Sequence, residues 1–405
     1  MSGTGTSTET STEAKGICAL AVRLSGWRDR VAALPPRAHV LILVGITVLS
    51  WGVLVLPLRE DLSVLYRYWD GPMYVMVAKT LYRIPVENPI TDVYTWPPKV
   101  FAPFLLAYPL AIRAVAPLLG YAWGMIALTV LTSAGAVALF YWMLVDLELT
   151  DHPLGLSIWF LFVPYRWLVY RSVGATEPLF LVFTIFSLHM FVRRRYAWSF
   201  SAAALACVTR IQGVLLVPTY LLLIFFDRKH SPLRGLLLLC GVAAIPSLLI
   251  ANFWVHARVY GDPLAYLSVN NEMVHLSPFW RLLDLASFSH VMVGGMGSQL
   301  LLLLYAITVI GLVKLWHVDR SKVLSVYCIF GALFLAFVSD EDLARFLIPF
   351  APFTWVLGLQ ELWNDRRMAW AFAILVPLTY AYTWQLLPSN AILPEVMRDL
   401  LAWSP

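Results

Sequence analysis

One carboxylate in this sequence, that of Asp70, has surroundings that suit acid–base chemistry at a membrane surface. It follows the first apolar segment of membrane length and stands between an aromatic cluster and a short helical run over residues 74–82. A carboxylate placed there can take a proton from a hydroxyl nucleophile. Asp70 also lies shortly before Pro72, a combination that is common at helix starts, so an N-capping role stays open beside a catalytic one.

Other ionisable residues occur in polar turns that we expect on the same side of the membrane as Asp70. They are Arg67, Glu87, Asp92, Lys99, Arg171, Glu177, Arg210, Arg258, Asp262, Glu272, His275, Glu341, Asp342 and Arg345. Ionisable groups at or below the membrane surface cost free energy, and they usually line a cavity or a substrate path. Because arginines can bind a phosphate bidentately, several of them around one carboxylate suit an anionic, lipid-linked substrate.

Many of these residues also have a purely structural interpretation. Glu177 precedes a proline and could cap a helix, whereas Arg345 could extend from a span end to the membrane surface. Arg210 is harder to explain in this way, because an unpaired arginine inside an apolar segment is costly. His275 is typical of a surface loop. The aromatic residues near Asp70 can stack on sugar rings, or they can form only an interfacial belt. They are Tyr66, Tyr68, Trp69, Tyr94 and Trp96.

The composition indicates an all-α, polytopic membrane protein. Of the 405 residues, 60% are hydrophobic and only 13% are charged, and the mean hydropathy is +0.74. Soluble domains usually carry about twice this charged fraction. Apolar runs of about 20 residues recur from Val40 onward without the alternation of barrel strands. Since no soluble linker interrupts these runs, we expect one bundle of roughly a dozen helices.

The charge and the short motifs exclude several classes of protein. The net charge is +5, but the basic residues lie at segment ends, where they orient helices, so nucleic acid is not an expected partner. The cysteines show no disulfide or metal-binding spacing; they are Cys18, Cys207, Cys240 and Cys328. No phosphate-cradling glycine loop or nucleophile elbow occurs, and the glycines of 294–297 are interpreted as helix packing or a flexible entry to a span. We therefore expect no metal or cofactor, and a sugar donor, if there is one, should arrive on a lipid.

The N-terminal region predicts which side of the membrane Asp70 occupies. Residues 1–37 are interpreted as a disordered tail followed by a basic cytoplasmic segment, because residues 2–14 have no hydrophobic pattern. Five basic residues precede the first span at 39–58, and they place the N-terminus in the cytoplasm. They are Lys15, Arg23, Arg28, Arg30 and Arg37. Residues 59–98 then form a large first outer loop with short interfacial helices.

The remaining chain predicts about 11 spans in total plus one dipping segment. The transmembrane domain covers 38–387, the second large outer loop is 256–290, and 388–405 is an outer tail. The proline-rich segment 101–119 is expected to dip into the outer leaflet and return. The later spans are expected at 121–145, 154–168, 178–192, 200–226 (two short helices meeting at a bend, 209–213), 236–255, 291–313, 323–338, 346–362 and 370–387.

The distribution of basic residues favours this topology over one alternative. With a dipping 101–119 and an outward bend at Arg210, the basic clusters near 193–195, 228–234, 314–322 and 366–367 all lie inside. The turns at 170–177, 209–213, 256–290 and 339–345 then face the side of Asp70. If 101–119 instead crosses and 200–226 is one helix, the 193–195 cluster moves outside and Glu177 moves inside.

Several segments, in order along most of the chain, resemble one known family. The run from Arg67 to Tyr74 is similar to the arginine/tryptophan/aspartate first-loop motif of the GPI mannosyltransferase II family of GT-C glycosyltransferases. Further segments that resemble the family's motifs are 94–98 with Pro103 and Pro109, 175–180, 209–213, 260–266 and 344–349. The chain departs from the family pattern at Met73–Tyr74, at Ala175–Thr176 and at Gln212, and these departures concern the choice of acceptor more than the reaction type.

The resemblance implies a reaction and a set of site residues. Mannose would pass, with inversion and without a metal, from a polyprenyl (dolichyl) phosphate mannose to a lipid-linked glycan or glycolipid, as in GPI-anchor-like biosynthesis. The site would face outward or toward the lumen, in a cell membrane or the endoplasmic reticulum. Asp70 would be the general base, Glu177 would support it or orient the acceptor, and Arg210 and Arg345 would hold the donor phosphate. The substrate-binding residues expected in all are Arg67, Trp69, Tyr74, Trp96, Arg210, Gln212, Asp262 and Arg345.

Three other functions stay open at this point. A related enzyme could use another polyprenyl-phosphate sugar. A glycolipid transporter or flippase without transferase activity should contain an internal repeat, and none is evident in the sequence. A non-catalytic scaffold subunit would tolerate changes at Asp70. The expected partners are the lipid-linked donor, the acceptor and membrane lipids, and a partner subunit is left open.

Overall fold

The computed structural model describes residues 30–31, 33–227, 232–273, 275–276, 296–339, 343–365 and 367–405. Its elements are helices apart from one two-residue antiparallel pairing of β1 (His275–Leu276) with β2 (Val338–Ser339). The all-helical prediction is therefore confirmed for this part of the chain. The predicted disordered tail, Cys18, the glycines at 294 and 295, residues 274 and 277–290 of the second outer loop, and Glu341 with Asp342 lie outside the described residues.

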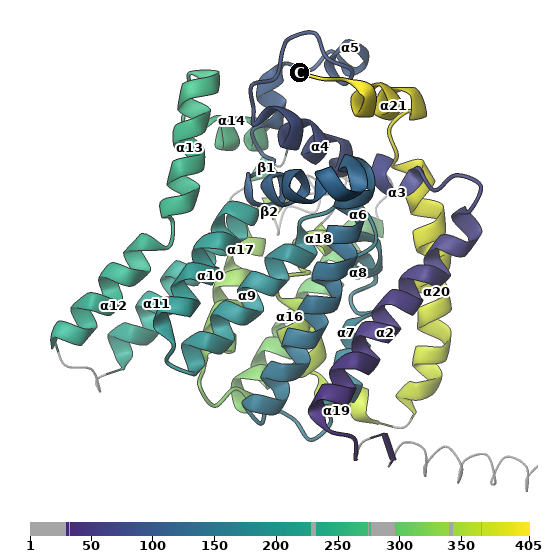
Figure 1. The fold of residues 1–405 in the computed structure, drawn as a ribbon. Coiled ribbons are helices and arrows are strands. Elements are labelled where there is room, and N and C mark those ends of the chain that lie inside the picture. Colours follow the sequence, from purple (N-terminus) through teal and green to yellow (C-terminus); the bar gives the residue numbers. More distant parts are fainter. Residues whose placement is uncertain are drawn as a thin grey trace, which may run out of the picture.

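Most of the helices form a bundle, and a second set of mostly short helices gathers at one end of it (Figure 1). The bundle helices are α2 (Pro36–Val55), α6 (Ala107–Asp146), α7 (Pro153–Phe160), α8 (Tyr165–Tyr170), α9 (Glu177–Val192), α10 (Tyr196–Thr209), α11 (Leu216–Phe226), α12 (Pro232–Ala244), α13 (Ser247–Tyr260), α16 (Met296–Val318), α17 (Val323–Leu335), η5 (Pro352–Leu357), α19 (Gln360–Asn364) and α20 (Met368–Ser389). The short elements are η1 (Leu56–Leu58), α3 (Val64–Arg67), α4 (Asp70–Thr80), α5 (Thr91–Tyr94), η2 (Pro98–Phe101), η3 (Ile211–Leu215), α14 (Ala265–Met273), α18 (Leu343–Phe346) and α21 (Pro394–Ala402).

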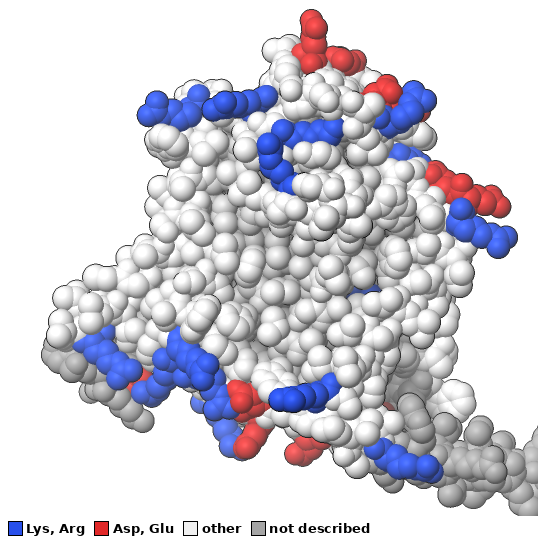
Figure 2. Space-filling view, viewed as in Figure 1, with Lys and Arg blue, Asp and Glu red and all other residues white. Residues whose placement is uncertain are grey.

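The two ends of the bundle carry nearly all of the charge on the face drawn in Figure 2. We call them the Asp70 end, where α3, α4, α5 and α21 lie, and the Arg193 end, where α6 and α9 finish. Between them runs a broad band with almost no charged side chains (Figure 2). An uncharged band between two charged rims is what a membrane-embedded helical bundle requires.

Three helices of the described residues are long and apolar enough to cross a membrane, by length and composition. They are Pro36–Leu58, Ala107–Asp146 and Leu233–Tyr260. Five further apolar helices of 10–17 residues accompany them. This architecture is compatible with a membrane helical protein. The predicted number of spans and their orientation stay predictions.

The segment expected to dip into the membrane lies across the Asp70 end of the bundle. Helix α6 has non-helical backbone at Gly120 (φ 72°, ψ 166°), and the part before this kink runs beside α4 instead of along the bundle (Figure 1). Glycine adopts this backbone at little cost, so the kink needs no compensating strain. Arg113 ties this part of α6 to α4, because its Nη1 donates to the carbonyl oxygens of Ala78 and Lys79 at 3.0 and 3.1 Å.

Several predicted spans are not single regular helices. The predicted break of 200–226 is confirmed, since α10 and α11 are separate helices joined by η3. The segments 154–168 and 236–255, however, each contain two helices, divided before Pro164 and Pro246 respectively. Proline lacks an amide hydrogen and disfavours helical backbone in the residue before it. Segment 346–362 is likewise divided, into α18, the π-helical η5 and α19.

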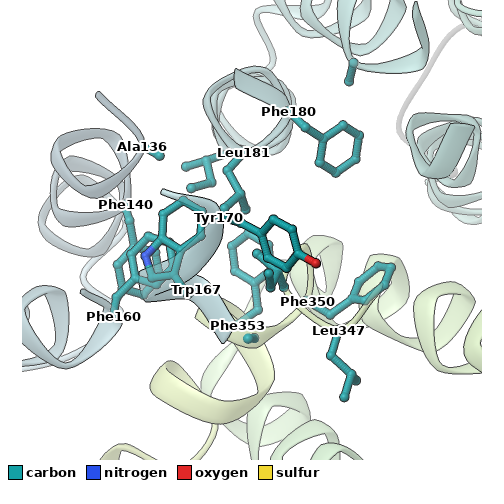
Figure 3. Packing of buried hydrophobic residues seen from close by; sticks show 14 of the residues in the cluster. Ala136, Phe140, Phe160, Trp167, Tyr170, Phe180, Leu181, Leu347, Phe350 and Phe353 are labelled. Carbon is teal, nitrogen blue, oxygen red and sulfur yellow. The ribbon is translucent and has the colours of Figure 1, made fainter. Parts of the chain in front are cut away.

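The core of the bundle is apolar and rich in aromatic side chains. Figure 3 shows Trp167 and Phe160 on one side of this core and Tyr170 in its middle, near Phe350. Phe160 and Trp167 stack with an interplanar angle of 5°. A second buried cluster forms under α4, where it joins α4 to the start of α6 and to α21. Residues on α4 are therefore held by packing at the Asp70 end.

Candidate active site

Asp70 begins α4, but its carboxylate does not cap this helix. The capping position is Trp69, and no side chain caps the helix start. Asp70 Oδ2 instead forms an ion pair with Nη2 of Arg345, a residue that follows it by more than 270 positions in the sequence. The capping interpretation of Asp70 is therefore not supported by the geometry, and its carboxylate belongs to a tertiary charge network.

Glu177 is the centre of this network. Its Oε1 accepts a hydrogen bond from Arg210 Nη1 at 2.6 Å and a second from Arg345 Nε. The Glu177 side chain is completely buried, whereas 13% of the Asp70 side chain and 17% of the Arg345 side chain are exposed. The four charged groups thus form a chain, Arg210–Glu177–Arg345–Asp70, in which Glu177 is completely buried and the other three side chains are between 10% and 17% exposed.

The turns that carry these groups also hold the guanidinium of Arg210 in place. Its Nη1 donates to Thr176 Oγ1 at 3.1 Å, and its Nε donates to Gln212 Oε1 at 2.7 Å. Gln212 Nε2 lies 3.5 Å from the carbonyl oxygen of Phe346, beside Arg345 in the sequence. Gln212 therefore contacts the network through Arg210 and connects two of its turns.

Arg345 rests on an aromatic ring that the sequence analysis did not identify. Its guanidinium carbon lies 4.3 Å from the ring centroid of Tyr170. Figure 3 places the same tyrosine among the buried side chains of the core. Burial opposes the positive charge of Arg345, but the carboxylates of Asp70 and Glu177 outweigh this effect and hold the pKa of Arg345 above its usual value. Arg345 is accordingly a permanently charged group at the edge of the core.

Two glycines allow close backbone approaches at the turns that carry the network. A Cβ atom on Gly174 would lie 3.0 Å from Gly71 Cα and would overlap the thioether of Met125. A Cβ atom on Gly213 would overlap the backbone of Cys207, so this glycine permits the bend at Arg210 to fold against the end of α10. Small residues at these positions are thus part of how the charged groups meet.

Tyr74 lies beside the charge network, next to Thr176. Its side chain is buried, its hydroxyl is 3.4 Å from Thr176 Oγ1, and its ring meets those of Phe104 and Tyr108 edge-on. Burial, and next the negative charge of Asp70, raise the pKa of the Tyr74 hydroxyl above its usual value. Tyr74 therefore remains neutral and can act only as a hydrogen-bonding group.

An aromatic cluster adjoins Asp70 in the sequence and is half-buried. Trp69 meets Trp96 at a centroid distance of 5.4 Å, and Tyr94 stacks on Trp96 at 4.9 Å with an interplanar angle of 18°. The structure thus brings the predicted residues Trp69 and Trp96 together at the start of α4.

The other two predicted substrate-binding residues lie outside the charge network. Arg67 forms hydrogen bonds to Asp61, to Ser63 and to the carbonyl oxygen of Ile392. Asp262 pairs with Lys99 at 2.7 Å and accepts the amide hydrogen of Leu264 at 2.8 Å. Each side chain has structural partners, which accounts for its position without a ligand.

The arrangement can perform proton transfer and anion binding. Asp70 is the one carboxylate of the network with an exposed edge, and two guanidinium groups lie behind it. Tyr170 and Thr176 were not among the predicted site residues, because one aromatic and one hydroxyl residue in the predicted turn 170–177 have no distinguishing pattern. Among the described residues, no group of three or more His, Cys, Asp and Glu side chains could hold a metal ion.

Comparison with known proteins gives no match. No protein-family model matches the sequence, and neither a curated protein nor a solved structure is similar to it.

Proposed function

We propose that the chain is a membrane glycosyltransferase that moves a sugar from a polyprenyl-phosphate donor to a lipid-linked acceptor. One observation carries this proposal: Asp70, Glu177, Arg210 and Arg345 share one charge network at the end of an apolar helical bundle. A base with an exposed edge, paired with one guanidinium group and linked to a second through Glu177, suits a reaction in which a hydroxyl loses a proton and a phosphate leaves. The choice of mannose rests on the sequence resemblance alone.

In the proposed reaction the acceptor hydroxyl gives its proton to the Asp70 carboxylate. The acceptor oxygen then bonds to the anomeric carbon as the bond from this carbon to the phosphate oxygen breaks, and the configuration inverts. The polyprenyl phosphate leaves with the bonding electron pair, and a guanidinium group stabilises its charge. Arg345 can do this because it is charged and partly exposed, with Tyr170 beneath it.

The geometry suggests a positioning role for Glu177 instead of contact with the acceptor. Its side chain is completely buried, and its Oε1 already accepts from both arginines. Arg345 also pairs with Asp70, so a phosphate bound to Arg345 would compete for the same guanidinium. Donor binding would in this way free the Asp70 carboxylate to act as a base.

The proposed orientation follows from the charges at the two ends. The Arg193 end carries Arg193, Arg194 and Arg195, and we assign it to the cytoplasmic side. The Asp70 end then faces outward or toward the lumen. A site at the Asp70 end would lie close to the phosphate of a lipid-linked donor, because this phosphate lies near the membrane surface.

The test is a transfer assay on purified protein with polyprenyl phosphates that carry different sugars and a glycolipid extract. Asp70→Asn should lower transfer by about 100-fold or more, because it removes the general base. Glu60→Gln changes an exposed carboxylate of the same loop and should leave transfer unchanged. Full activity of Asp70→Asn would contradict the role of this residue. Movement of glycolipid across liposomes without any product would instead favour a transporter.

A second variant examines the donor site. Arg345→Ala should raise the donor KM more than the acceptor KM, because the phosphate belongs to the donor. Arg345→Lys, which keeps the charge but loses the planar, bidentate geometry, should recover only part of the loss. Equal effects on the two substrates would argue against a phosphate contact.

A further inference from the structure

The C-terminal segment of the chain lies against the residues that immediately precede Asp70. The amide hydrogen of Trp69 is donated to the carbonyl oxygen of Asn390 at 3.0 Å, and that of Ile392 to the carbonyl oxygen of Arg67 at 2.9 Å. Tyr68 and Ala391 form an isolated antiparallel bridge between these two bonds. The backbone of residues 67–69, just before Asp70, is therefore paired with residues 390–392, more than 300 positions later in the sequence.

Arg67 strengthens this pairing with its side chain. Its Nη1 donates to the carbonyl oxygen of Ile392 at 2.5 Å, its Nη2 pairs with Asp61 at 2.6 Å, and its Nε donates to Ser63 at 2.8 Å. Only 8% of the side chain is exposed. With all three kinds of nitrogen in use, the guanidinium serves to join two backbone segments.

Helix α21 extends the contact along α4. Its side chains Val396, Met397 and Leu400 are buried in the same apolar cluster as Met73 and other residues of α4. At the far end, Lys79 Nζ donates to the carbonyl oxygens of Leu401 at 2.9 Å and Trp403 at 2.6 Å. A cation at a helix C-terminus satisfies carbonyl groups that have no partner within the helix. Figure 1 shows α21 at the Asp70 end, above the bundle.

Local sequence alone does not hold Asp70 in position. No side chain caps α4. The start of this helix therefore depends on neighbours. The neighbours that the structure provides are the close contact with Gly174 on one side and residues 390–392 on the other.

We propose that Arg67 is a positioning residue. It holds residues 390–392 against residues 67–69 and thereby fixes the position of the Asp70 carboxylate relative to Arg345. This inference rests on the proposed function. In it, Arg67 aligns the general base Asp70 and does not bind the substrate. A shift of the base by about 1 Å can cost up to about 100-fold in rate.

The test compares Arg67→Ala with Arg398→Ala in the full-length protein. Arg398 lies on α21 but is 76% exposed and pairs only with the adjacent Asp399 among the interactions described. Hydrogen exchange is followed in peptides covering 66–74 and 388–397, and kcat and both KM values are measured. We expect Arg67→Ala to speed exchange in both peptides and to lower kcat about tenfold or more with the donor KM unchanged. Arg398→Ala should change neither readout.

Asp61→Asn provides a second variant that does not disturb the core, because Asp61 is half exposed. It removes one of the partners of Arg67 and should speed exchange in the same two peptides to a smaller extent. Unchanged exchange in both Arg67→Ala and Asp61→Asn would overturn the proposal. Faster hydrogen exchange in Arg67→Ala with a normal kcat would also overturn it. The same holds for a raised donor KM in Arg67→Ala without faster hydrogen exchange.

These outcomes are separable from failure of the proposed function. If Asp70→Asn transfers sugar normally, the glycosyltransferase mechanism fails whatever Arg67 does. If Asp70→Asn is inactive and Arg67→Ala keeps its kcat, only the positioning role fails.

Discussion

The two ends of the bundle both pair acidic with basic side chains, but they bury them to very different extents. At the Arg193 end, Arg193 pairs with Asp146 and Lys314 with Glu361, and the two basic side chains are each 45% exposed. At the Asp70 end, Glu177 is completely buried between Arg210 and Arg345. Exposed pairs contribute little to stability, and buried pairs can cost more in lost hydration than they return.

This difference is our reason for placing the proposed function at the Asp70 end. The exposed pairs at the Arg193 end are adequately explained by orientation of helices and contact with water, although the buried His189 also pairs with Asp146 there. The network at the Asp70 end has no such explanation, because an apolar core of the same shape could be equally stable. A fold that nonetheless gathers four charged groups there, around a completely buried carboxylate, is expected to use them. The predictions below, in order of decreasing effect, test this contrast.

Glu177→Gln should have the largest effect of the changes considered. It leaves two guanidinium groups beside a neutral side chain inside the protein, and removing one partner of a buried ion pair typically costs about 3–5 kcal/mol. We expect a clear fall in the free energy of unfolding, measured by denaturant titration in detergent, together with loss of transfer. The matched change Glu361→Gln at the other end should leave both unchanged. If Glu177→Gln and Glu361→Gln lowered stability and transfer to a similar extent, the proposed difference between the two ends would be wrong.

Gly174→Ala should have an intermediate effect. Its Cβ would press on Met125 and on the backbone of Gly71 and so separate the turns that carry Asp70 and Glu177. Overpacking of this kind costs about 1–3 kcal/mol, and we expect transfer to fall by about tenfold from the displaced base. The control Gly45→Ala places its methyl group in open space on α2. Normal transfer in Gly174→Ala would mean that the spacing of the two turns is unimportant.

Asp262→Asn should have the smallest effect, and it should depend on pH. The hydrogen bond from Lys99 lowers the pKa of Asp262 below its usual value of 3.8. The charged carboxylate therefore stabilises the folded state above that pH, and this contribution disappears as the pH falls through the folded-state pKa. Wild type should melt slightly above the variant at pH 7, and the two should coincide once the pH is below the folded-state pKa of Asp262. A difference that persists in acid would show that the ion pair is not its cause.

Sequence patterns predicted the helical class and several local features of this fold. The apolar runs gave the helices, and Thr209 to Gly213 gave the break between α10 and α11, because a charged residue and a glycine interrupt an apolar segment there. Patterns did not predict where proline would divide 154–168 and 236–255. A hydropathy window averages over a single proline, whereas the backbone responds to it residue by residue.

For the candidate site, residue chemistry was more informative than position. Asp70, Glu177, Arg210 and Arg345 were identifiable because ionisable groups beside apolar segments are costly and therefore rare. Arg67 and Asp262 carry the same kinds of charge, yet the structure gives them Asp61 and Lys99 as partners. Nothing in sequence spacing separates an arginine that faces a site from one that joins two backbone segments.

The sequence by itself determined that this chain is apolar, helical and charged mainly at segment ends, because these properties follow from composition and periodicity. Only the tertiary structure decided which charges meet. Arg345 reaches both Asp70 and Glu177, and residues 390–392 lie beside Asp70, because helix packing brings together turns that are far apart in the chain. Local propensity acts over a few residues, whereas these contacts depend on how the whole bundle closes.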